Sequence, residues 1–525
     1  MLYITKRPLL VHMGRMVGLP LLLLFLLLTL LTACGGSRVD PMARYLPAMR
    51  PPFQGELARL QTLPRYAINV EFFPTENRLL GKMRVDLVNT SPDPWPYAIF
   101  RLYPELADYK GNMAIKSTAV NGAIVPFSYQ AHDTALLVQF PEFLQPDEAV
   151  TIDMSWSLDI PVFPDHSSVY VLFGQSQQMY TLPLFYPSLA VYQPAKGVSG
   201  EWWLTEGTIR GDSAFNVASL FVVTATMPAD QVPVTSGTLI TSTFIEGARA
   251  RHVWVTGPSR EFLLHTSTQF RSAHTEAYGT RVTSYWLPGQ EAMGRAALNY
   301  GVAALRIYAD NFGAYPYRDM RIAPAPLNFR GMEYPQVSLL GVEVYDQYRS
   351  DLELLLAHEV AHQWWYQLVH NDPVSEPWLD EALAEYSMKL YLEELRGERS
   401  AGNLLRSRWS LPVQGMQTKG DAALVNQAVS DFATASLYET VIYAKGALFY
   451  DAVRQSLGDR RFNNFLRDYL ADHRYGIVTT RDWLQAIHAL NTPEIEVLYE
   501  EWVHHPPARP ALTPTPLIDT SSAQR

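Results

Sequence analysis

Cysteine is almost absent from this 525-residue chain, which contains a single one, Cys34. One cysteine cannot form an internal disulfide, and it disfavours a structural zinc site built from cysteine ligands. Basic charge is also scarce: 42 Lys and Arg stand against 52 Asp and Glu, the formal net charge is −10, and no basic run occurs. This balance excludes nucleic acid as an expected partner.

The chain has one long apolar run, near its start. Residues Met16–Leu31 are almost entirely apolar and follow the basic Lys6, Arg7 and Arg15. The run ends in Leu-Thr-Ala-Cys-Gly, which looks like a bacterial lipoprotein cleavage box around Cys34. We therefore expect a signal peptide at residues 1–33, lipidation of Cys34, and a membrane-anchored protein on an extracytoplasmic face, at the cell surface or in the periplasm. The alternative is an uncleaved signal anchor, for which the run is short.

Two further segments lack the periodicity of packed elements. Residues 34–63 contain the expected lipidated cysteine and then four prolines, and they read as a spacer between lipid and domain. Residues 506–525 combine Pro and Thr repeats with a polar end, and we expect a disordered tail.

Residues 64–269 show the pattern of short strands separated by turns. Ala67–Phe72 and Leu80–Val88 alternate apolar and polar side chains, and Asn121-Gly122 is a hairpin turn signal. We predict an antiparallel, sandwich-like β domain here. Similar runs occur at residues 135–140, 150–158, 221–226 and 251–255.

Residues 270–505 become helical in pattern from Glu291 onward. Residues 350–353, Ser-Asp-Leu-Glu, read as a capping box that opens one helix, and Pro377 and Gly397 bracket another. The predicted helices cover residues 291–312, 352–369, 377–396, 438–457 and 460–473.

One of these predicted helices carries the sequence His358-Glu359-Val360-Ala361-His362. Positions i and i+4 share a helix face, so His358 and His362 can both point a ring nitrogen at one ion. Glu381 lies in the next predicted helix and supplies a carboxylate. Two imidazoles and one carboxylate leave the fourth tetrahedral position open, which is typical of a catalytic zinc. We predict one Zn²⁺ per chain, with Glu359 as the general base.

Three other segments resemble the gluzincin aminopeptidases, the family of aminopeptidase N and leukotriene hydrolase. Residues 330–335 (Arg-Gly-Met-Glu-Tyr-Pro) are similar to the family's Gly-Ala-Met-Glu-Asn motif, and residues 443–447 (Tyr-Ala-Lys-Gly-Ala) to its Tyr-Glu-Lys-Gly segment. Residues 312–317 resemble the strand entry before the substrate-binding edge. The resemblance implies an α+β multidomain protein, in which the amino-terminal β domain precedes a thermolysin-like, mainly helical zinc metallopeptidase domain.

The resemblance also implies roles for particular residues. Tyr443 would hydrogen-bond the oxyanion of the reaction, although a tyrosine on an apolar helix is often only packed. Glu333, in the segment with Gly331 and Met332, would bind the free ammonium of a peptide. Otherwise it is a solvent-facing carboxylate on an edge strand. The chain departs from the family motif at Arg330 and Tyr334, and Arg330 is a possible partner of Glu333.

Together these features favour a zinc aminopeptidase that hydrolyses the first peptide bond of peptide substrates. Two alternatives remain at this point. One is a zinc endopeptidase of related fold, which Glu333 disfavours. The other is a non-catalytic lipoprotein that uses the scaffold for binding, which the complete set of ligands, base and tyrosine disfavours.

Overall fold

The computed structural model describes residues 40–164, 171–195, 198–205, 211–328, 330–421 and 423–504. The chain divides into two compact units, Met1–Ala43 and Arg44–Arg525, and the second holds the sheets, the helices and the candidate site. The predicted signal peptide, Cys34 and the predicted tail at 506–525 lie outside the described residues.

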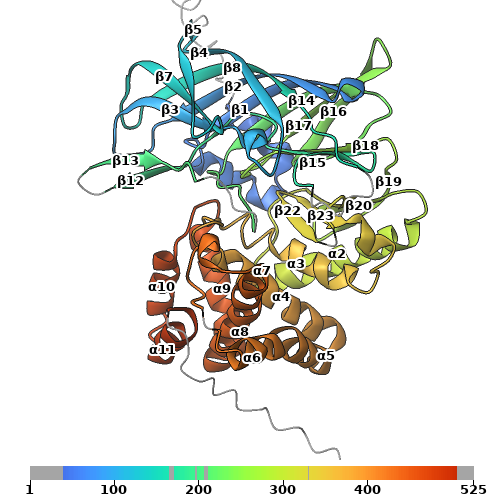
Figure 1. The fold of residues 1–525 in the computed structure, drawn as a ribbon, viewed down its shortest axis with the longest axis vertical. Helices are drawn as coiled ribbons and strands as arrows, with labels where there is room; N and C mark the ends of the chain where they lie inside the picture. The colour runs from blue at the N-terminus through green and yellow to red at the C-terminus, as the bar shows by residue number, and fades with distance from the viewer. Residues whose placement is uncertain are drawn as a thin grey trace, which may run out of the picture. The chain divides into compact units, whose positions relative to one another are not determined.

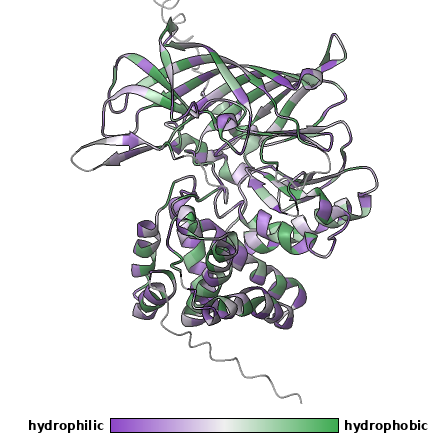
Figure 2. Cartoon of the chain, in the orientation of Figure 1, coloured by the Kyte–Doolittle hydropathy of each residue, from purple (hydrophilic) through white to green (hydrophobic). Residues whose placement is uncertain are grey.

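An eight-stranded sheet dominates the first part of this unit (Figure 1). Alternating burial explains its strands: Leu79, Met83 and Val85 of β2 face the core while their neighbours face outward, and Figure 2 shows this alternation of hydropathy along the strands. The sheet order is β16-β17-β14-β1-β2-β8-β4-β5. Its strands are β1 (Arg65–Phe73), β2 (Arg78–Val88), β4 (Asn112–Val120), β5 (Ala123–Ile124), β8 (Ala149–Asp159), β14 (Leu220–Pro228), β16 (Thr238–Ile245) and β17 (Arg249–Val255).

The predicted hairpins are present, but the sheet is not wholly antiparallel. β1 pairs with β2 antiparallel, and Asn121-Gly122 joins β4 to β5 with positive φ at both residues, 49° and 85°. β1 also pairs with β14 in parallel, with Arg65 opposite Leu220. This parallel pair corrects the expectation, because alternation along a strand reports its faces and not its neighbours.

Smaller sheets complete the sandwich-like β domain. Trp156 and Val223 of the large sheet share one buried core with Phe100, Leu136 and Phe185 of the facing segments. The sheet orders are β11-β3-β7-β6, β15-β18-β10-β9 and β12-β13. The strands are β3 (Trp95–Arg101), β6 (Phe127–Gln130), β7 (Ala135–Leu144), β9 (Gly174–Ser176), β10 (Met179–Pro183), β11 (Ser188–Leu189), β12 (Tyr192–Ala195), β13 (Val198–Trp202), β15 (Val232–Thr235) and β18 (Leu263–Ser267).

A mixed five-stranded sheet follows, with the order β19-β20-β21-β23-β22. β22 forms one edge of this sheet and pairs antiparallel with β23 alone. Helix α2 (Glu291–Phe312) has the predicted bounds and packs on this sheet. The strands are β19 (Arg271–Ala277), β20 (Thr280–Trp286), β21 (Asp319–Ala325), β22 (Gly331–Tyr334) and β23 (Val337–Gly341).

The remaining helices form the mainly helical part of the second domain. Trp378, at the start of α4, is fully buried against Phe449, Trp483 and Tyr499, and this aromatic cluster joins α4 to α8, α10 and α11. The α-helices are α3 (Leu352–Ala361), α4 (Trp378–Arg396), α5 (Glu398–Leu404), α6 (Leu411–Thr418), α7 (Ala435–Tyr438), α8 (Gly446–Leu457), α9 (Asp459–His473), α10 (Thr480–His488) and α11 (Pro493–Tyr499). The π-helices are η6 (Leu405–Ser410), η8 (Glu439–Lys445) and η9 (Glu500–His504), and the 3-10 turns are η3 (Pro74–Glu76), η4 (Tyr103–Glu105), η5 (Val342–Tyr345) and η7 (Val429–Asp431).

Two details of the helix predictions are wrong. The helix expected over 352–369 ends at Ala361, and the chain then turns through Tyr366, whose φ is 118°. The expected capping box is also missing, since Asp351 is the N-cap and makes no side-chain cap bond. The Glu353 carboxylate instead accepts from Tyr391 and pairs with Arg396, because tertiary partners compete with the local cap.

Residues 44–63, within the spacer predicted at 34–63, contact the rest of the unit. They form the 3-10 helices η1 (Ala43–Ala48) and η2 (Pro51–Arg59), which run along the second domain. The Arg50 backbone N–H donates to Pro316 O at 2.9 Å, its guanidinium donates to Tyr315 O at 2.6 Å, and Glu56 pairs with Arg474 at 2.9 Å. Prolines suit the first turn of such short helices, which lack the 3.6-residue periodicity used for prediction.

The architecture confirms the predicted fold class, an amino-terminal β domain followed by a mainly helical domain (Figure 1). Within the described residues, no helix has both the length and the apolar character that a membrane span requires.

Candidate metal centre

Three ligand atoms from α3 and α4 converge on one point. Nε2 of His358 and Nε2 of His362 lie 3.1 Å apart, and each lies 3.3 Å from Glu381 Oε2. Metal bonds of about 2.1 Å at tetrahedral angles would place ligand atoms about 3.4 Å from one another, so this set fits zinc. The predicted ligands are therefore brought together, and all three residues are buried.

Local structure explains why these three side chains meet. His358 lies in the last turn of α3 and His362 is its C-cap, so both project from one face of the helix. Glu381 lies in the first turn of α4, where a carboxylate is favoured by the helix dipole. Burial alone would raise the pKa of Glu381, but hydrogen bonds from the two histidines lower it below its ordinary range.

A buried carboxylate outside the ligand cluster orients His358. Glu385 Oε2 lies 3.5 Å from His358 Nδ1, which directs Nε2 at the ligand cluster. Glu385 is itself held by Nε and Nη2 of Arg408, at 2.5 and 3.1 Å, and by Trp409 Nε1 at 2.7 Å. Arg408 and Trp409 come from η6, and nothing in the local sequence identified them.

His362 is oriented by different groups. Its Nδ1 lies 3.0 Å from Trp365 O and 3.9 Å from Asp380 Oδ2. Asp380 is fixed in turn, because its Oδ1 accepts from Asn371 Nδ2 at 2.8 Å. The turn that ends α3 thus supplies the carbonyl that sets the direction of the second imidazole.

The predicted base, Glu359, lies between the ligand cluster and β22. Its carboxyl lies against Gly331, and a β-carbon at position 331 would overlap Glu359 Oε1. Burial raises the pKa of Glu359 to about 7. A carboxyl with a pKa near neutrality is suited to exchange protons in both directions.

Tyr443 lies on the other side of the cluster, on η8. Its hydroxyl donates to Glu381 Oε1 at 2.6 Å, and its ring lies 5.8 Å from the His358 ring. Burial raises the pKa of Tyr443 well above its ordinary value, so the phenol stays protonated and can donate. Tyr438 is also buried and packs edge-on against Tyr443.

Glu333, Met332 and Gly331 form β22 on the wall beside the base. Glu333 is 7% exposed. One of its carboxylate oxygens lies within 4.8 Å of a ring nitrogen of His362 and of a carboxylate oxygen of Asp380. Burial raises the pKa of Glu333 well above its ordinary range. It is therefore not the solvent-facing carboxylate of the alternative interpretation.

These residues line a cleft of about 1060 Å³. The β domain contributes residues that the sequence did not reveal, among them Asp108, Lys110 and Asp212. The hydroxyl of Tyr366 lies within hydrogen-bond distance of two acceptors, the Asp212 carboxylate and Ala214 O, which ties the β domain to the segment after His362. These β-domain residues reach the cleft through long-range packing, and no local sequence pattern identifies them.

Residues 296–502 match the family model described as the Peptidase family M1 domain, and this range contains the ligand cluster, Glu333 and Tyr443. The chain carries a peptidase family M1 domain. Zinc is the metal that this domain implies for the ligand cluster.

Relatives of the M1 domain are distant and longer. Aminopeptidase M1-C of Oryza sativa subsp. japonica is 26% identical over 244 residues, which cover 43% of this chain and 27% of that protein. Leukotriene A-4 hydrolase of Xenopus laevis is 27% identical over 198 residues, covering 36% of this chain and 32% of that one. The matched region thus spans a third or less of these curated relatives.

Solved structures resemble most of the chain. M1 zinc metallopeptidase from Deinococcus radiodurans has a TM-score of 0.64 at 18% identity, covering 84% of this chain and 93% of that one. A mutant of that metallopeptidase bound to a Tyr-Ser-Ala substrate has a TM-score of 0.62 at 17% identity, with 84% and 93% covered. These likenesses show that the β domain and the M1 domain form a two-domain fold of this kind.

Proposed function

We propose that this protein is a zinc-dependent aminopeptidase, which removes the first residue from peptides. The observation that carries the proposal is a buried carboxylate, Glu333, which lines the cleft beside the His358–His362–Glu381 cluster. A peptide ammonium placed there would be paired with Glu333, and only the first peptide bond would then lie at the ligand cluster. The family match and the named aminopeptidase relatives support the same reaction.

The shape of the β22 wall supports exopeptidase activity. Tyr334 and Gln336, which follow Glu333, are buried, whereas the cleft lining continues from Glu333 back through Gly331 to Arg330. A peptide whose first residue lies at Glu333 would therefore extend along β22 towards Arg330. An endopeptidase would need open space on both sides of the reacting bond.

The side chains around the cluster have distinct tasks in this reaction. Zinc, when bound, supplies Lewis acidity that activates water and polarises the peptide carbonyl. Glu359 accepts the proton of the attacking water and passes it to the leaving amine, which its raised pKa allows. Tyr443 donates its hydroxyl proton in a hydrogen bond to the carbonyl oxygen as negative charge develops there.

The first test is hydrolysis of aminoacyl reporter amides by the purified protein. Activity should be lost on chelation, return with one equivalent of zinc, and fall by about 10²-fold in Glu333→Ala with zinc content unchanged. Glu398→Gln, an exposed carboxylate outside the cleft, is the matched control. Full activity in Glu333→Ala would remove the amine-binding role and favour the endopeptidase alternative.

The location of the enzyme is a separate part of the proposal. The cleavage box around Cys34 supports lipidation there, which would anchor the protein to a membrane on the extracytoplasmic side without a spanning helix. Cys34→Ser should abolish both fatty-acid labelling and signal cleavage. A labelled Cys34→Ser protein would contradict the anchor.

A further inference from the structure

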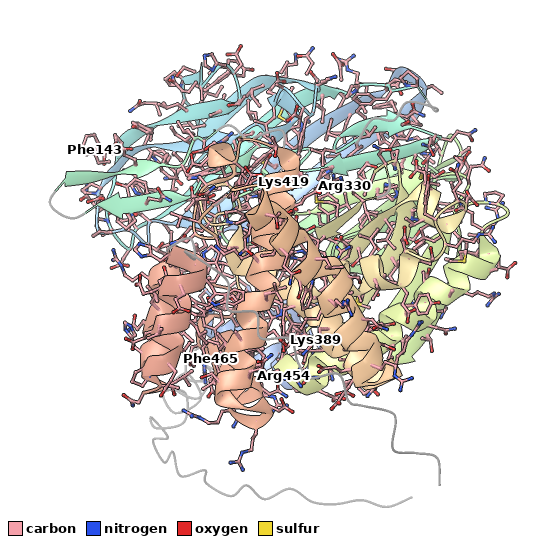
Figure 3. All side chains as sticks on the ribbon, turned by 60° about the horizontal axis from the view of Figure 1, so that its bottom comes forward. Phe143, Arg330, Lys389, Lys419, Arg454 and Phe465 are labelled. Atoms are coloured by element: carbon pink, nitrogen blue, oxygen red, sulfur yellow. The ribbon has the colours of Figure 1, made fainter. Side chains whose placement is uncertain are left out.

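The M1 cleft has a basic side chain at the far end of its substrate-binding strand. Arg330 immediately precedes β22, lines the cleft and is 64% exposed. Its guanidinium donates to Glu439 Oε1 at 2.8 Å, and Glu439 lies on η8, one helical turn from Tyr443. The Arg330–Glu439 pair therefore joins the two walls of the cleft, the β22 wall and the η8 wall. Figure 3 shows Arg330 where strands and helices of this unit meet.

The distance from Glu333 to Arg330 along the strand sets the length of peptide that can reach both residues. A strand rises about 3.3 Å per residue, so Arg330 and Glu333 lie about 10 Å apart along β22. β22 is the edge strand of its sheet and lines the cleft through Gly331, Met332 and Glu333, so an extended peptide would lie along it, antiparallel, with its ammonium at Glu333. An extended tripeptide also spans about 10 Å from ammonium to carboxylate. Its carboxylate would then reach the Arg330 guanidinium.

The other charged groups in the cleft leave Arg330 as the suitable partner for that carboxylate. Arg408 is held by the buried Glu385, and Lys110 lies over the Phe163 ring at 5.6 Å on the β-domain side. Asp212 also lines the cleft and lies close enough to Glu333 to interact with it, so a peptide carboxylate is disfavoured beside these two acidic groups. Asp108 and Asp351 also line the cleft. The carboxylates of Glu333 and Asp212 and the guanidinium of Arg330 thus match the two charged ends of a zwitterionic peptide.

We propose that Arg330 is a specificity-determining residue that binds the free carboxylate of tripeptide substrates. The inference rests on the proposed aminopeptidase function. In the bound state the peptide carboxylate replaces Glu439 as the partner of Arg330. This exchange costs little, because an ion pair between two exposed side chains is weak and screened by water. The bidentate fork of arginine suits a carboxylate, whereas a peptide amide offers it one neutral oxygen.

The test compares the peptide Tyr-Ser-Ala with its carboxy-terminal amide, using zinc-loaded protein and kcat/KM for release of the first residue. The wild type should prefer the free acid by about tenfold, which is the scale of one charge-assisted contact. Arg330→Ala should bring the acid-to-amide ratio close to one, and Arg330→Lys should retain part of it. Glu439→Gln should raise the ratio, because the competing carboxylate is gone.

Arg295→Ala and Glu291→Gln are the matched controls, since this exposed pair at 2.8 Å lies on α2 and outside the cleft lining. Both should keep the wild-type ratio. Equal rates for acid and amide in the wild type, or an unchanged ratio in both Arg330→Ala and Glu439→Gln, would overturn the inference alone. No hydrolysis of either peptide by the wild type would overturn the proposed function as well, so the two failures are distinct.

Discussion

Gly331 and Glu359 are in direct contact, and this contact is the most exacting steric requirement of the site. A methyl group at position 331 would overlap the Glu359 carboxyl, which would have to leave its observed position beside β22. Gly331→Ala should therefore displace the base and lower kcat by at least about tenfold with zinc retained.

The control for this substitution is Gly402→Ala on α5, where an added β-carbon meets nothing within 4 Å. It should leave kcat unchanged. Wild-type kcat in Gly331→Ala would show that Glu359 does not need its observed position.

Glu359 itself should be needed for proton transfer and not for metal binding. Glu359→Gln keeps the shape of the side chain but cannot accept a proton, so kcat should fall by about 10²–10⁴-fold. Metal analysis should still give one equivalent of zinc, because His358, His362 and Glu381 are untouched. Loss of zinc from Glu359→Gln would indicate that it is a ligand.

Tyr443 should contribute through its hydroxyl alone. Tyr443→Phe removes one donor to the developing oxyanion, and kcat should fall by about 10²–10³-fold with zinc retained. Tyr278→Phe, an exposed tyrosine that is 48% accessible, is the control. If kcat survives in Tyr443→Phe, the tyrosine is only packed, and Tyr438 becomes the next candidate donor.

At the scale of elements, η6 contacts α4 through the Glu385 carboxylate. Arg408 and Trp409 hold Glu385, and Glu385 orients His358. Glu385→Gln should weaken zinc affinity by about 10–100-fold, measured by competition with a chelator, because the imidazole loses its charged partner. Glu398→Gln serves again as the control. An unchanged affinity would mean that the helices alone fix the ligand.

Some elements could be predicted from the sequence because they carry their own signals. Helix α2 has the predicted bounds, Glu291–Phe312, since its periodicity is long and Gly313 ends it. The ligands on α3 were also predictable, because i and i+4 spacing is a local property. Glu381 followed from its place in the next helix.

Other elements could not be predicted, for physical reasons. β21 is buried along almost its whole length, so its sequence shows no alternation of apolar and polar residues. The five-stranded sheet was therefore not predicted, apart from the strand segment that carries Glu333. The turn after Ala361 is also entirely buried and reads as more helix. Asp212, Arg408 and Trp409 reach the site from distant segments, and only the packed fold brings them there.

At the scale of the second compact unit, the cleft is built by both domains. β22 and α3 supply one wall, η8 supplies another, and the β domain adds Asp212 and Lys110. The hydroxyl of Tyr366 bonds Asp212 across the domains, so the segment that orients His362 is braced from the β side. β22, which carries Glu333, and the β-domain residues thus line one cleft, and this shared lining underlies the proposed restriction to the first peptide bond.

The most direct measurement of that restriction compares Tyr-Ser-Ala with the same peptide acetylated at its amino group. Acetylation removes the positive charge and leaves Glu333 buried against a neutral group, at a cost of roughly 2–5 kcal/mol in transition-state binding. The zinc-loaded wild type should cleave the free peptide at least about 30-fold faster by kcat/KM, which is the lower end of that cost. Equal rates for the free and acetylated peptides, with cleavage at internal bonds, would contradict the aminopeptidase account.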